Sequence, residues 1–188
     1  MKPPKPSLSP ESAGIAPIPD ATIAAFLERM HQLLLKESPA EDDIALTGQL
    51  NRRSLDFSLD SLHEIDRYLN AVHDNAEGIS GLPLLSTIWT IAMYVGEVIR
   101  QGAPNKDYQW VSVGEPSGSS GETTISYPDL GAVRALRARD GDMCMPSRTV
   151  LLIILRGGKA RSICSFARAA MGRAGVIAKA VSPSARSS

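Results

Sequence analysis

The sequence predicts a single α+β domain, in which a helix pair packs on a small antiparallel sheet and further helices follow toward the C-terminus. Apolar residues recur at helical spacing in several stretches, and they alternate as in a strand between residues 108 and 114. A length of 188 residues suits one hydrophobic core of ordinary size. With 43% hydrophobic and 21% charged residues, the composition is that of a globular protein and excludes a wholly disordered chain.

The folded part is expected between residues 20 and 173. Residues 1–19 contain six prolines and little apolar material, so they are expected to form an extended, disordered tail. Residues 174–188 are rich in Ala and Ser and are expected to be flexible. One domain with two flexible ends is therefore the predicted organisation.

Two amphipathic helices are predicted first. The first begins with Asp20 as its N-cap and ends near Glu37, before a Ser-Pro step that stops it. The second follows Ser58, a good N-cap, and its apolar stripe runs to Val72. Residues 41–53 between them are predicted mostly as loop.

The stretch from Leu84 to Gln101 is apolar nearly all round, which predicts a core helix buried on most sides. A membrane span is the rival interpretation. We disfavour it because the apolar run is shorter than a bilayer requires and is interrupted by Glu97.

A small sheet is predicted after the core helix. Residues 108–114 and 123–127 are strand candidates, and the Gly- and Ser-rich connection between them predicts an antiparallel hairpin with a long loop. An Asp-Gly turn precedes a third candidate, Met143 to Met145, which predicts a further short strand.

The apolar run from Val150 to Leu155 is compatible with a buried strand or a short buried helix. Pro146 before it and two glycines after it favour the helix. Residues 160–171 carry apolar side chains on one side and charged or polar ones on the other, which predicts a further amphipathic helix.

The cytoplasm is the expected location. The N-terminus lacks the apolar run of a secretory signal. Cys144 and Cys164 do not form a C-x-x-C pair, and both are expected to be reduced and buried.

The formal net charge of zero conceals a division along the chain. Residues 131–188 carry a net charge of +9, and residues 1–130 carry −9. Such a division indicates either an acidic partner or two oppositely charged parts of one fold that face each other. We favour the second, because no aromatic residues are interleaved with the arginines, as binding of single-stranded nucleic acid requires. The arginines that could bind an anion, a nucleic acid or an acidic protein are Arg148, Arg156, Arg161 and Arg168.

No cofactor or metal motif is present. A Gly-Gly-Lys-Ala run at residues 157–160 lacks the earlier glycine and the Ser or Thr of a phosphate-binding loop. The three histidines, His31, His63 and His73, have no second ligand at helical spacing, so we predict no metal site.

Two residues qualify as candidates for chemistry. Glu97 is a lone acid in an apolar helix, so it must be paired, neutralised or functional. Arg100 is its nearest possible partner, and an ion pair with a basic C-terminal residue is the favoured interpretation. Cys164 has Arg161 and Arg168 one turn away, which would favour a thiolate, but the sequence assigns it no base.

The order of signals over residues 55–172 resembles a group of small uncharacterised bacterial α+β proteins, a domain of unknown function. The resemblance implies a bacterial source, a helix pair on a small sheet, and a helix over residues 150–155, but it implies no activity. By analogy, small stand-alone domains of this kind resemble immunity or interaction proteins. The segments that carry the resemblance are Leu55 to Leu62, Tyr94 to Arg100, Trp110, Met145-Pro146, Arg156 to Gly158 and Arg161 to Ile163.

A non-enzymatic protein-binding module is the leading functional hypothesis. It would act through the C-terminal arginines, with an acidic protein as partner, or through the acidic N-terminal helices. The alternatives are a small enzyme that uses Glu97 or Cys164, and nucleic-acid binding by residues 131–173, whose affinity would fall steeply with salt.

Overall fold

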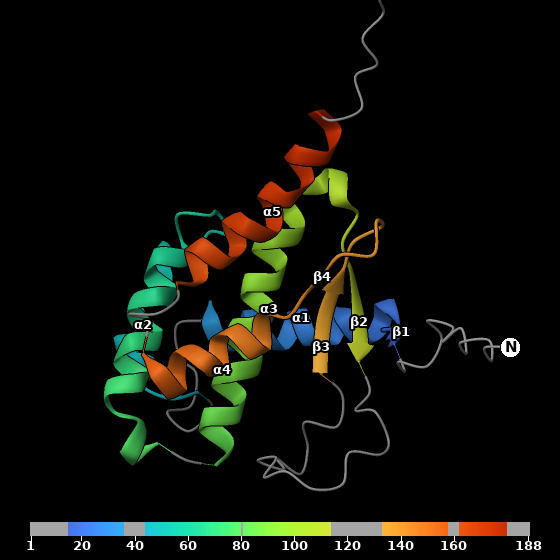
Figure 1. Cartoon of the computed structure of the whole chain (residues 1–188). Coiled ribbons are helices and arrows are strands. Elements are labelled where there is room, and N and C mark those ends of the chain that lie inside the picture. The colour runs from blue at the N-terminus through green and yellow to red at the C-terminus, as the bar shows by residue number, and fades with distance from the viewer. Residues whose placement is uncertain (1–14, 36–43, 80, 114–132, 158–161, 180–188) are drawn as a thin grey trace, which may run out of the picture.

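The structure is a computed structural model that describes residues 15–35, 44–79, 81–113, 133–157 and 162–179. Within these ranges the chain forms five α-helices and a four-stranded antiparallel sheet (Figure 1). The predicted α+β class is therefore confirmed.

The strands lie side by side in the order β1 (Ile15–Pro17), β2 (Gln109–Val113), β3 (Val133–Arg137) and β4 (Met143–Cys144). Each neighbouring pair is antiparallel. The short strand predicted over residues 143–145 is thus confirmed. The predicted hairpin partner of β2, residues 123–127, lies outside the described residues, and the structure pairs β2 with β3 instead.

Strand β3 was not predicted, because two arginines obscure its apolar pattern. Leu136 is fully buried, whereas the Arg134 guanidinium stacks on aromatic rings, 3.6 Å from the centroid of Phe26 and 4.7 Å from that of Trp89. A guanidinium is suited to an aromatic face, so this side of the strand is covered despite its charge. Burial lowers the pKa of Arg134.

Regular structure extends beyond both predicted domain boundaries. Strand β1 lies in the segment that was expected to be a disordered tail, because its backbone has a partner in β2. The Ile18 N–H continues this pairing by donating to the Trp110 carbonyl at 3.1 Å. At the other end, the last helix runs to Lys179, past residue 173.

Helices α1 (Asp20–Leu34), α2 (Leu62–Asp74) and α3 (Leu82–Gly102) correspond to the three helices predicted in the first half. Helix α2 starts later than predicted, because Ser58 caps a turn rather than the helix and its Oγ accepts the Ser61 N–H at 3.1 Å. The predicted loop over residues 41–53 contains two single-turn 3₁₀ helices, Thr47–Gln49 and Arg52–Ser54.

Helix α3 is the core helix, as predicted. It contacts α1, α4 (Pro146–Arg156) and α5 (Ile163–Lys179), and most of its length is buried inside the fold (Figure 1). By length and composition alone α3 is also apolar enough to cross a membrane, a test that the core helix of a globular fold passes equally.

Helix α4 confirms the helical interpretation of residues 150–155. Pro146 occupies its first turn, and Gly157 ends it with a φ of +73°, a conformation that glycine adopts without strain. The next helix, α5, is capped from a distance, since the Asp66 carboxylate of α2 accepts the Ile163 N–H and the Ser162 hydroxyl, both at 2.6 Å. This cap ties α5 to α2.

Candidate binding groove

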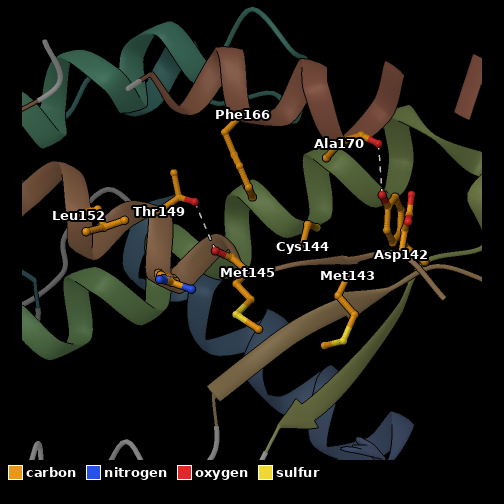
Figure 2. A pocket seen from close by; sticks show the side chains of 10 residues that line it. Asp142, Met143, Cys144, Met145, Thr149, Leu152, Phe166 and Ala170 are labelled. Carbon is orange, nitrogen blue, oxygen red and sulfur yellow. Dashed lines mark hydrogen bonds between the residues drawn. The ribbon is translucent and has the colours of Figure 1, made fainter. Parts of the chain in front are cut away.

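An open groove of about 460 Å³ lies where β4 leads into α4, with α5 as its opposite wall (Figure 2). Met143 and Met145 flank the end of the strand, Leu152 extends from α4, and Phe166 and Ala170 extend from α5. A volume of this size lies within the range of pockets that bind small ligands or the side chains of a peptide.

Helical spacing explains how the two helices build the walls. Arg148 and Leu152 are four residues apart on α4 and therefore share one face, as do Phe166 and Ala170 on α5. The start of α4 is held in place by the Met145 carbonyl, which accepts the Thr149 N–H at 3.3 Å and the Thr149 hydroxyl at 3.4 Å.

Four apolar side chains of this groove are only partly buried. Met143, Met145, Leu152 and Phe166 all retain contact with solvent. Methionine is flexible and polarisable, so it adapts to irregular partners and is common on peptide-binding surfaces. The groove therefore combines apolar surface with side chains that can change conformation to fit a partner.

The two ends of the groove differ in charge. At one end Arg148 is exposed, and within the described part of the chain no carboxylate pairs with it. At the other end Asp142 accepts a hydrogen bond from the buried ammonium of Lys106 at 3.1 Å, and Asp140 accepts another at 2.8 Å. Two carboxylates share one cation there, so this cluster of three side chains carries a net charge of −1.

The structure does not gather the predicted arginines into one site. Of the four, Arg148 lines the groove, whereas Arg156 at the end of α4 and Arg168 on α5 are exposed and do not line it. Arg161 lies outside the described residues. Neither α4 nor α5 contains an Asp or Glu, so the three described arginines still give these helices a positive surface.

Glu97 lies apart from the groove and is 3% exposed. Its carboxylate accepts hydrogen bonds from the Arg100 Nε and Nη2 atoms at 3.0 and 2.8 Å, and from the Trp110 indole N–H at 3.0 Å. The favoured ion pair with a basic C-terminal residue is wrong, because Arg100 one turn along the same helix takes that place. Glu97 is thus fully engaged inside the fold.

Cys164 has a histidine neighbour that sequence reasoning missed. The His63 Nε2 atom lies 3.7 Å from the Cys164 Sγ atom, although 101 residues separate the two. A thiol beside an imidazole is a pair used for nucleophilic catalysis. However, Cys164 is only 2% exposed, and burial raises the pKa of its thiol, with Arg168 opposing and Asp66 adding to the shift. The thiol is therefore held neutral in the core.

The other two histidines, for which no metal site was expected, have structural neighbours. The His73 Nδ1 atom lies 2.8 Å from the Ile154 carbonyl oxygen, and His31 stacks near Phe57 with ring centroids 5.6 Å apart. Within the described ranges, no three His, Cys, Asp or Glu side chains come together as a metal site. Cys144 is buried like Cys164, as expected, and neither is in a disulfide.

Comparison of the chain with protein-family models, with curated proteins and with solved structures gives no match. The resemblance to a group of bacterial α+β proteins therefore stays a prediction. A functional proposal therefore rests on the shape and the charges of the groove.

Proposed function

We propose that the protein is a binding module that takes a segment of a partner protein, with apolar and acidic side chains, into the groove between β4, α4 and α5. The observation that carries the proposal is Arg148, which lies exposed and without a carboxylate partner among the described residues, beside the partly buried Met145 and Leu152. Apolar side chains supply affinity in such a groove, and a charge at one end supplies orientation.

The charge distribution favours one orientation of the partner segment. A carboxylate of the segment is expected beside Arg148, because the opposite end of the groove carries Asp142, which shares the ammonium of Lys106 with a second carboxylate. Arg156 and Arg168 lie on the same two helices and would attract an acidic partner at longer range.

A display selection with random peptides tests this proposal. Peptides are selected on the wild-type protein at low and at physiological ionic strength, and their affinities are then measured by isothermal titration calorimetry. We expect enrichment of peptides that combine Asp or Glu with apolar residues. Arg148→Glu should weaken their binding about tenfold or more, as loss of a charge-assisted contact combined with repulsion predicts.

Arg139→Glu is the matched control. Arg139 is also exposed but lies outside the groove, and the charge change is identical. A selection without enrichment, or an equal loss of affinity in both variants, would contradict the proposal. Binding of single-stranded nucleic acid with equal loss in the two variants would instead favour a diffuse electrostatic surface.

The contact between Cys164 and His63 favours a second candidate function, a thiol-dependent enzyme. It requires Cys164 to become accessible and to lose its proton to His63, whereas its burial and raised pKa oppose both steps. The rate at which Cys164 is alkylated in the native protein distinguishes the two functions.

A further inference from the structure

We propose that Arg52 and Arg53 form a second site, distinct from the groove, that binds an oxyanion such as a phosphate or carboxylate group. The site is a hollow of about 720 Å³ beside the C-terminal end of α1. It is lined by Leu35, Leu50, Asn51, Arg52 and Arg53.

Arg52 carries the proposal because one edge of its guanidinium has no acceptor in the described part of the chain. Its Nε and Nη2 atoms are buried, and neither donates a hydrogen bond to any of the described residues. These two nitrogens form the edge that holds an oxyanion through two parallel hydrogen bonds. A charged group that is shielded from water and lacks a partner is unfavourable, so the edge calls for an acceptor.

Two other arginines of this protein show what such an edge binds. Arg67 uses its Nε and Nη2 atoms to hold the carboxylate of Glu64, and Arg100 uses the same pair of atoms to hold Glu97. Arg52 presents the same donor pair, and no carboxylate from the described ranges accepts from it. The missing partner therefore has the geometry of a carboxylate or a phosphate.

The nearby acid Glu64 is already occupied by other contacts that hold the loop around Arg52 in place. The Glu64 carboxylate also accepts the Asn51 N–H at 2.5 Å, and Arg67 donates to the Gln49 carbonyl. These contacts attach the loop to α2 while its two arginines stay beside the hollow. Arg53 is exposed and supplies a second positive charge, which favours a phosphate dianion over a single carboxylate.

The unpaired edge is covered by neighbouring groups in the present conformation. An anion is therefore reached by rotation of the Arg52 side chain into the hollow that it lines, rather than by entry into a finished cavity. Leu35 and Leu50 border the same hollow, so an apolar part of a ligand would find surface there.

The experiment is a titration of the full chain with inorganic phosphate and, separately, with acetate, at an ionic strength held constant with sodium chloride. NMR follows the Nε–H resonances of the arginines, and thermal unfolding is recorded in parallel. We expect phosphate to shift the Arg52 resonance and raise the Tm of the wild type. In Arg52→Gln the affinity should fall about tenfold or more, while Arg139→Gln keeps it. A larger response to acetate than to phosphate would assign the site to carboxylate ligands.

A second measurement compares the Tm of Arg52→Gln with that of the wild type in the absence of phosphate. Because Arg52 donates no hydrogen bond from its buried edge to any residue that the structure describes, Arg52→Gln should be at least as stable as the wild type in chloride alone. A clear loss of Tm in this variant would show that the edge has a structural partner and would overturn the proposal. So would an Arg52 resonance that neither anion moves. Neither result bears on the groove, whose peptides Arg52→Gln should bind as the wild type does.

Discussion

The indole ring of Trp110 lies against the Cα atom of Gly96, and an added Cβ there would lie 2.3 Å from two of its ring carbons. The same indole donates its N–H to Glu97, the next residue of α3. The close contact of the Trp110 ring with Gly96 and its hydrogen bond to Glu97 thus join the core helix to the sheet at one point.

Gly96→Ala should therefore destabilise the protein. The ring is buried and cannot move aside freely, so overpacking is expected to cost about 1–3 kcal/mol of unfolding free energy or more, measured by urea denaturation. Gly172→Ala is the matched control, since an added Cβ in α5 meets nothing within 4 Å. It should be neutral or stabilise by up to about 1 kcal/mol, because alanine favours a helix over glycine. Equal effects in both variants would contradict the close packing.

Glu97→Gln should lower the unfolding free energy by about 1–3 kcal/mol, because Arg100 loses a buried ionic partner. Peptide binding in the groove should be unchanged, since Glu97 does not line it. Glu77→Gln, at an exposed position, should stay within about 0.5 kcal/mol of the wild type. A loss of peptide affinity with intact stability in Glu97→Gln would instead assign Glu97 a functional role.

Lys106 should make stability depend on pH at both extremes. The hydrogen bond from Lys106 holds the pKa of Asp140 below 3.8. The contribution of this bond to the unfolding free energy is therefore present above about pH 4 and is lost as the pH falls further. The same bond raises the pKa of Lys106 above 10.5, so its contribution is lost as the pH rises beyond that value. Burial raises the pKa of Tyr68 to about 12, which adds a further loss of stability above pH 10.

Lys106→Met tests this assignment by urea denaturation at acidic, neutral and alkaline pH. The variant should be less stable at neutral pH, and its stability should fall less steeply at acidic pH than that of the wild type. If stability fell equally steeply at acidic pH in the variant and the wild type, other carboxylates would be responsible for that loss of stability.

Leu152→Asp should weaken the peptides selected on the wild type by about tenfold, because it places a charge among the apolar side chains of the groove. Leu155→Asp is the matched control on the same helix, since Leu155 is 52% exposed and does not line the groove. It should leave the affinity unchanged. Calorimetry on both variants decides the point, and similar affinities for the two would speak against the groove as the binding site.

Cys164 should react slowly with iodoacetamide in the native protein. Burial and a raised pKa predict a rate at least about 100-fold below that of the urea-unfolded chain, measured in a Cys144→Ala background. Removal of the neighbouring imidazole in His63→Ala should change the native rate little. A native rate above the unfolded one, lost in His63→Ala, would favour the thiol-enzyme function instead.

Local periodicity in the sequence was sufficient to predict the five α-helices of the described ranges, the strand at residues 109–113 and the strand at Met143. The helix over residues 150–155 could be separated from a strand only through Pro146 and the glycines that follow it. These features depend on neighbours within one or two turns, so they can be recognised without knowledge of the fold.

The tertiary structure decided everything that depends on distant pairing. Strand β3 escaped prediction because the aromatic rings that cover Arg134 come from other elements. Strand β1 escaped because its extended, proline-rich segment pairs with a strand that is distant in the sequence. His63 meets Cys164, and Asp66 caps α5, across about a hundred residues. The adjacent arginines at 52 and 53 were visible as the single Arg-Arg pair of the sequence, but only the burial of one guanidinium edge marks a site. Which polar groups find partners depends on packing over long separations, and local sequence patterns do not contain that information.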